Sequence, residues 1–101
     1  MYTLSRVTDE VLSLFKNQRP WTQEEISSSL PNSQIKDVKY SLRQLRRKGI
    51  ITQTPNILDM RRVFYRISTQ DEFYESCKNM NSVEIRFYQS ILNSALEQPS
   101  K

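Results

Sequence analysis

Apolar residues recur at helical spacing in the first 48 residues and give way to an alternating pattern after them. The first periodic segment predicts a helix over residues 6–17, in which the apolar positions share one face: Val7, Val11, Leu14 and Phe15. Thr8, which two acidic residues follow, offers an alternative start because carboxylates favour the N-terminal end of a helix. Pro20 disfavours helical backbone in the residue before it, so the helix is expected to end there.

A second, short helix has the clearest start signal in the sequence. Thr22 and Glu25 form a capping box, and Trp21 with Ile26 forms the hydrophobic staple that accompanies such a start. Pro31 is expected to end this helix. A tight turn then predicts a third helix.

The third helix is expected over residues 34–48. Ser33 belongs to the turn that would supply its N-cap, and Gly49 would take the left-handed conformation at its end. Its predicted buried stripe consists of Ile35, Val38, Leu42 and Leu45.

The rest of the chain predicts a hairpin and more helix. Alternating β-branched and aromatic residues predict strands at 50–54 and 61–67, joined by a wide loop over residues 55–60. Thr69 and Glu72 form a second capping box and open a helical last third. Weak helix formers near residues 79–82 leave open whether one kinked helix or two follow.

Composition excludes several classes of site. The 101 residues include no His, one Cys and one Gly. The chain therefore lacks the residues for His-dependent catalysis, a Cys-rich zinc site, an internal disulfide or a glycine-rich phosphate loop. No apolar stretch reaches the length of a membrane span, and the N-terminus does not resemble a signal peptide. We expect one cytoplasmic domain that needs no cofactor or metal, has no membrane partner and is not an enzyme.

Charge is concentrated in the middle of the chain. Residues 34–67 carry nine basic and two acidic side chains, whereas the first third has a net charge of −1 and the last third of −2. Basic charge gathered on one part of a small domain is typical of a surface that binds a polyanion. The alternative is an ordinary solvated basic helix.

Three helices followed by a β-hairpin resemble the winged helix-turn-helix domain of small prokaryotic, archaeal or viral repressors. The resemblance is carried by the segment TQEEISSSLPNSQIKDVKYSLRQLRRKGIITQTP and the returning strand RRVFYRIS. It implies an α+β, mostly helical fold, with a DNA-binding domain over residues 1–68. Residues 69–98 resemble the dimerising helices of repressors of the penicillinase, arsenical-resistance and multiple-antibiotic-resistance type. Residues 99–101 are expected to be a disordered tail.

The third helix is the expected reader of DNA. At 100° per residue, Tyr40, Arg43 and Arg47 fall within about 40° of Lys36, opposite the predicted buried stripe. Residues near the start of such a helix meet base edges in the major groove, and those near its end more often meet phosphate. Candidate DNA contacts are therefore Ser33, Gln34, Lys36, Asp37, Lys39, Tyr40 and Arg43, with Arg46, Arg47 and Lys48 as phosphate contacts. Tyr40 could instead pack against the first helix.

Part of this helix is also similar to the recognition helix of Z-DNA-binding winged helices. Tyr40 matches that pattern, but Lys36 stands where the family has Asn, and the predicted wing lacks the Pro-Trp pair. The sequence therefore favours the general winged helix over the Z-DNA-binding type.

The predicted wing carries two kinds of candidate contact. Arg61 and Arg62 suit the concentrated negative potential of a narrow minor groove. Ile57, Leu58 and Met60 are unusual for an exposed tip. They could fold back on the domain, meet a second protomer or press into the groove as wedges.

The apolar content of the last third exceeds what one small domain is expected to cover. We expect part of this apolar content to dock on the first helix and part to pair across a twofold axis. The candidate dimer residues are Phe73, Cys77, Ile85, Tyr88, Leu92 and Leu96. Cys77 is interpreted as a buried apolar residue. The sequence therefore predicts a homodimeric regulator of transcription that binds double-stranded DNA. The alternative is a winged-helix protein-interaction module without DNA contact.

Overall fold

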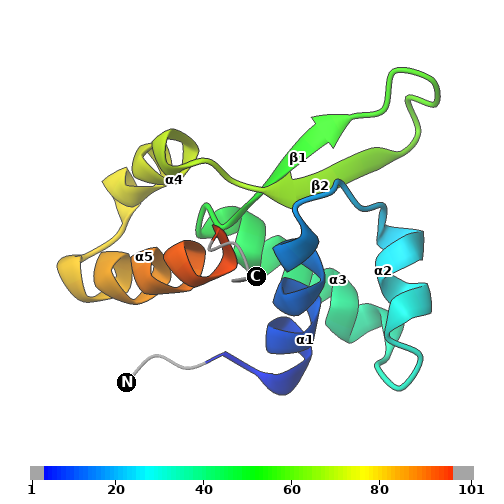
Figure 1. The fold of residues 1–101 in the computed structure, drawn as a ribbon, viewed down its shortest axis with the longest axis horizontal. Helices are drawn as coiled ribbons and strands as arrows, with labels where there is room; N and C mark the ends of the chain where they lie inside the picture. Colours follow the sequence, from blue (N-terminus) through cyan, green and yellow to red (C-terminus); the bar gives the residue numbers. More distant parts are fainter. Residues whose placement is uncertain (1–3, 97–101) are drawn as a thin grey trace, which may run out of the picture.

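The computed structural model describes residues 4–96, and within that range it has five α-helices and one antiparallel hairpin (Figure 1). The elements are α1 (Arg6–Leu14), α2 (Gln23–Ser29), α3 (Ile35–Arg47), β1 (Ile51–Pro55), β2 (Val63–Ile67), α4 (Gln70–Ser76) and α5 (Ser82–Leu96), with 3-10 turns at Phe15–Asn17 and Cys77–Asn79. The expected order of three helices and a wing is confirmed. The last third forms two helices, and the tail expected over residues 99–101 lies outside the described residues.

Both predicted capping boxes are present, whereas the alternative start of α1 is wrong. Thr22 and Thr69 each accept a hydrogen bond from the backbone N–H three residues on, and the glutamate there accepts one in return. The N-cap of α1 is Ser5, whose hydroxyl accepts from the backbone N–H of Thr8 at 3.1 Å. Thr8 is itself buried, and its hydroxyl lies 2.8 Å from that of Ser41 on α3. This residue therefore joins two helices instead of starting one.

The start of α3 also differs from the expectation. Its N-cap is Gln34, which makes no side-chain capping bond. The Ser33 hydroxyl instead donates to the Glu10 carboxylate of α1 at 3.4 Å. Ile35, expected in the buried stripe, is 59% exposed because the first turn of α3 extends beyond the core. Val38, Leu42 and Leu45 are buried as predicted.

The end of α3 follows the prediction. Gly49 has φ 77°, and the backbone N–H groups of Gly49 and Ile50 donate to the carbonyl oxygens of Arg46 and Leu45. This is the bonding pattern of a helix closed by a left-handed residue. A Cβ on Gly49 would also lie 2.6 Å from Cβ of Ser76 in α4, so only glycine fits.

The hairpin is joined to the loop between α1 and α2 by a single β-bridge. β1 and β2 pair from Ile51 with Ile67 to Pro55 with Val63. Trp21 exchanges two backbone hydrogen bonds with Tyr65, at 2.8 and 2.7 Å. The loop between α1 and α2 is therefore fixed to the base of the wing, a link that the sequence pattern did not indicate.

One core unites the N-terminal three-helix unit with the C-terminal helices. Every α-helix, the turn after α1 and the start of the hairpin contribute fully buried residues: Val11, Phe15, Ile26, Val38, Ile50, Ile51, Phe73 and Leu92. Phe73 and Leu92 were expected at a dimer interface. Both have 0% exposure within one chain, so that expectation is wrong for these two residues. Residues 70–96 therefore belong to the same folded unit as the helices and hairpin before them.

Candidate nucleic-acid interface

The outward face of α3 is polar, cationic and exposed along its whole length. Lys36, Lys39, Arg43 and Arg47 are exposed, and Tyr40 among them is 56% exposed. Val38, Ser41, Leu42 and Leu45 turn the opposite face into the core. Because Tyr40 is more than half open, it is available on the cationic face. Its ring also borders a small hollow near Leu4 and Thr8.

Four cations of this face have no acidic partner within the described residues 4–96. None of the ion pairs there includes Lys36, Lys39, Arg43 or Arg47. We call these four residues the open cations. Their charges add up along one helix without a compensating carboxylate, which makes the face attractive to a polyanion.

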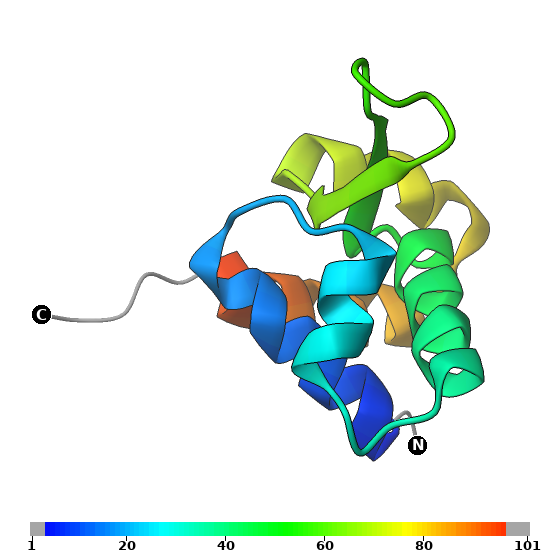
Figure 2. The ribbon, with the colours of Figure 1, turned by 90° about the vertical axis from the view of Figure 1, so that its right-hand side faces the viewer.

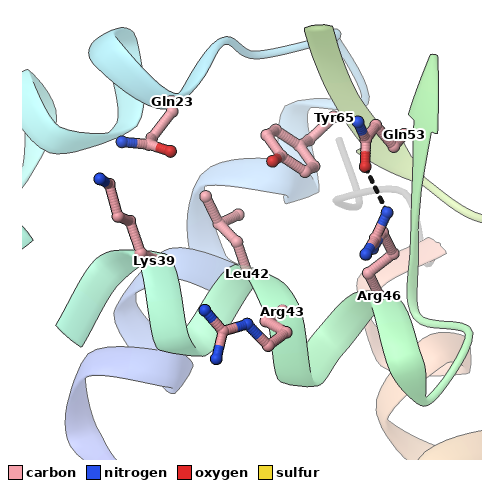
Figure 3. Close-up of a pocket in the computed structure, with 7 residues that line it drawn as sticks. All are labelled: Gln23, Lys39, Leu42, Arg43, Arg46, Gln53 and Tyr65. Atoms are coloured by element: carbon pink, nitrogen blue, oxygen red, sulfur yellow. Dashed lines mark hydrogen bonds between the residues drawn. The ribbon is translucent and has the colours of Figure 1, made fainter. Parts of the chain in front are cut away.

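A hollow of about 310 Å³ lies between α2, α3 and the hairpin, beside the open cations (Figure 3). Its rim is polar or cationic apart from one leucine, and it is lined by Gln23, Lys39, Leu42, Arg43, Arg46, Gln53 and Tyr65. Figure 3 shows Lys39 and Gln23 opposite each other across one end of the hollow. At the other end Arg46 donates a hydrogen bond to the side-chain oxygen of Gln53 on β1. The strand therefore holds this guanidinium beside the hollow.

The wing arginines lie next to the same region. Arg61 and Arg62 have side-chain exposures of 92% and 55%, and both contact the Asp59 carboxylate, at 3.3 and 3.4 Å. They also border a second hollow, of about 140 Å³, to which Gln23 and Tyr65 contribute. These two residues line both hollows, so the wing arginines and the open cations share one continuous surface. In Figure 2, α2, α3 and the wing lie toward the viewer, with α5 behind them.

Two other cations of the basic middle segment point away from this surface. Nζ of Lys48 lies 2.6 Å from Oε2 of Glu84 on α5, so a phosphate contact by Lys48 stays a prediction that would require this ion pair to open. Arg66 makes two parallel hydrogen bonds to the Glu72 carboxylate, at 2.9 and 2.7 Å. The Lys48 hydrogen bond lowers the pKa of Glu84, and the Arg66 hydrogen bonds lower that of Glu72 to about 2. We call Lys48 and Arg66 the closed cations.

The other candidate residues are placed as follows. Gln34 and Asp37 are exposed at the start of α3, whereas Ser33 is half-buried beside Glu10. Four of the candidate dimer residues are half-buried: Cys77, Ile85, Tyr88 and Leu96. Burial raises the pKa of the Cys77 thiol.

Two negative findings apply to the described residues alone. None of the helices there is both long and apolar enough to cross a membrane. Nor does any group of three or more His, Cys, Asp or Glu side chains between residues 4 and 96 have a geometry that could hold a metal ion.

Three residues of the hollow were missed by sequence reasoning: Gln23, Gln53 and Tyr65. Gln23 opens α2 and the other two pair directly across the hairpin. The pairing of the two strands was the only pattern in the sequence that pointed to these residues, because it sets Gln53 and Tyr65 directly opposite each other. Their position beside α3 depends on the Trp21–Tyr65 link and could not be read from periodicity.

Comparison with known proteins places the fold. No family model matches the chain, and neither does any curated protein. Among solved structures, a mutant MarR from E. coli complexed with operator DNA has a TM-score of 0.57 at 21% identity, over 93% of this chain and 76% of that chain. The S. aureus MepR–DNA complex has a TM-score of 0.58 at 19% identity, over 90% and 66%. The adhesin competence repressor AdcR of Streptococcus pyogenes has 0.60 at 13% identity, over 94% and 81%.

This chain has the winged helix-turn-helix fold. In that fold α2 and α3 are the helix-turn-helix, and β1 with β2 is the wing. The expected resemblance is therefore confirmed at the level of architecture. The open cations lie on the second helix of the motif, and the winged-helix frame places the 310 Å³ hollow between that helix and the wing.

Proposed function

We propose that this protein binds double-stranded DNA and regulates transcription. The observation that carries the proposal is the row of open cations on α3, opposite the buried face of that helix. An α-helix fits the major groove, and an uncompensated cationic face suits the phosphates on either side of it. The MarR and MepR structures that share this fold were solved with operator DNA and DNA. Their arrangement supports the same class of partner here.

The contacts divide along α3. Gln34, Lys36 and Tyr40 lie at the N-terminal half, the part of such a helix that meets base edges. Arg47 lies near the end and would contact phosphate. Arg43 lies in the middle of α3 and also lines the hollow. Its guanidinium can bind either a guanine edge or a phosphate oxygen.

The hollow suits a phosphate of the DNA backbone. Lys39, Arg43 and Arg46 offer cationic donors around it, and Gln23 offers an amide donor. A phosphate bound there would fix the depth of α3 in the groove, because backbone contacts set the register in which bases are read. Arg61 and Arg62 would then lie over the flanking minor groove.

Two copies would act together. Cys77, Tyr88 and Leu96 pack against the core and are only partly covered by it, Ile85 is half-buried and Val83 is exposed, so the C-terminal helices keep some apolar surface open. A homodimer formed through this surface would present two α3 helices to successive major grooves, about 34 Å apart. Sedimentation of the full chain checks this, and a monomer at tens of micromolar would contradict it.

The function is tested by selecting duplexes from a random-sequence pool and measuring the affinity of the parent and of Arg43→Ala. We expect the variant to lose about 1–3 kcal/mol of binding free energy and to change folding stability by under about 0.5 kcal/mol. Arg86→Ala, which removes an exposed arginine of α5, is the matched control and should bind as the parent does. If Arg43→Ala also binds as the parent does, Arg43 is not a DNA contact. If the parent itself selects no duplex, the protein-interaction module becomes the better interpretation.

A further inference from the structure

The tip of the wing presents three large apolar side chains to solvent. Ile57, Leu58 and Met60 have exposed fractions of 85%, 98% and 74%. The expectation that they fold back on the domain is therefore wrong. Single exposed apolar residues are common, but three within four positions of one projecting loop call for a partner.

The shape of the tip is set by hydrogen bonds within the loop. Oδ1 of Asn56 accepts from the backbone N–H groups of Leu58 and Asp59, at 3.1 and 3.2 Å. The backbone N–H of Arg62 donates to the Asp59 carbonyl oxygen at 3.0 Å. The loop satisfies its polar backbone locally, and this leaves the apolar side chains directed outward.

Charge around the tip indicates the kind of partner. Asp59 is the one acidic residue between positions 56 and 66, and its carboxylate already contacts both Arg61 and Arg62. The apolar tip is thus bordered by two arginines, one of them 92% exposed. A second copy docked tip to tip would bring like charges together, whereas a nucleic acid would bring phosphates to them.

We propose that Leu58 enters the minor groove of the bound duplex, wedges between two base pairs and bends the DNA. This inference rests on the proposed function. Side chains of this kind partly unstack a base step when inserted from the minor groove, and the resulting bend is toward the major groove. The minor groove is narrow and admits one large side chain, and Leu58 is the most exposed of the three. Leu58 therefore inserts, while Ile57 contacts the edge of the groove. Arg61 and Arg62 hold the flanking phosphates.

The experiment uses a duplex selected by the parent protein, with 2-aminopurine placed in turn along the flanking minor groove and fluorophores at both ends. The full-length parent should raise the 2-aminopurine signal at one step and shorten the end-to-end distance. Leu58→Ser should abolish both changes and weaken binding about tenfold, the loss of one buried leucine contact. Leu58→Phe keeps an apolar wedge and should restore the bend. Tyr74→Ser, which removes an exposed apolar side chain from α4, far along the chain from the tip, is the control.

The outcomes separate this inference from the function beneath it. A parent that binds DNA without bending it, or a Leu58→Ser variant that bends DNA as the parent does, overturns the wedge and leaves the Arg43 test standing. If Leu58→Ser keeps the bend but sediments as a smaller species, the tip is a contact between copies and the wedge is also overturned. A parent that selects no duplex overturns both proposals.

Discussion

The positive charges of the basic middle segment, residues 34–67, meet two opposite kinds of surroundings. On one face the open cations Lys36, Lys39, Arg43 and Arg47 have no carboxylate partner within residues 4–96. On the other side, Lys48 after the end of the helix and Arg66 on β2 are held by Glu84 and Glu72 of the C-terminal helices. The same residue type therefore stabilises the fold in one place and is left free to bind in the other.

This division shows what the C-terminal helices contribute beyond apolar surface. Their two carboxylates neutralise the cations that lie nearest to them and leave the rest uncompensated. A basic segment with a net charge of +7 thus becomes one cationic face and one neutral, packed face. The comparison predicts that removing the C-terminal helices, changing the salt concentration or changing single residues will affect the two faces differently.

The largest effect is expected from deleting residues 70–101. The deletion removes Phe73 and Leu92 from the core together with the partners of both closed cations. Each lost apolar side chain costs about 2–5 kcal/mol, and a domain has about 5–15 kcal/mol in total. We expect the truncated chain to lose cooperative thermal unfolding by circular dichroism. A truncated chain that melts like the parent would show that the first 69 residues form an independent domain.

The next effect concerns the open face in the parent protein. If a dimer neutralises about six phosphates, the logarithm of its affinity for duplex DNA should fall with the logarithm of salt concentration at a slope of roughly −5. From 50 to 200 mM salt the affinity should then drop by about 10³. Fluorescence anisotropy with a random duplex measures the slope. A slope near zero would mean that the open cations do not meet phosphates.

How far the sequence predicts this division depends on the length scale of the signal. Both capping boxes and the glycine end of α3 were predicted because each is a local pattern within four or five residues. The open cations were predicted by helical phase. Phase also carried a signal for Lys48, which lies about 120° from Lys36 and thus off the open face. Only its distance along the chain had suggested a phosphate contact.

The remaining errors come from contacts between distant segments. Ser33 was expected in the N-cap of α3, but the N-cap is Gln34, and the Ser33 hydroxyl donates to Glu10 of α1. Phe73 and Leu92 were assigned to a second protomer because periodicity shows which side of a helix is apolar and does not show what covers it. The link between Trp21 and Tyr65, 44 positions apart, has no local signature.

A smaller effect is expected on the pH dependence of folding stability, in which the two capping boxes should differ. Arg66 holds the pKa of Glu72 at about 2, below its usual 4.5, so its ionised form stabilises the fold above about pH 4.5 and that contribution is lost as pH falls toward 2. The side chain is 35% exposed, and with solvent screening we expect Glu72→Gln to cost about 1–2 kcal/mol at neutral pH. The difference from the parent should shrink below pH 4 in urea unfolding curves.

Glu25→Gln is the matched control for that measurement. Glu25 also completes a capping box, and glutamine can replace glutamate there. Its arginine partner, Arg19, lies farther away at 3.5 Å, and both side chains are 45% exposed. We therefore expect a smaller loss of stability. Equal losses in the two variants would mean that the Arg66 pair adds nothing to the cap.

The smallest effect separates two neighbouring residues, Arg47 and Lys48. Arg47 is an open cation, so Arg47→Ala should weaken binding to all duplexes alike and reduce the salt slope by about 0.9 for each copy, with little change in stability. Lys48 is tied to Glu84, so Lys48→Ala should lower the thermal unfolding midpoint and leave the salt slope unchanged. Anisotropy and thermal melting of both variants are compared side by side. A cation that stays paired with a carboxylate releases no counterion from DNA. Equal reductions in the salt slope would therefore mean that the salt bridge to α5 opens on binding and that Lys48 also contacts phosphate.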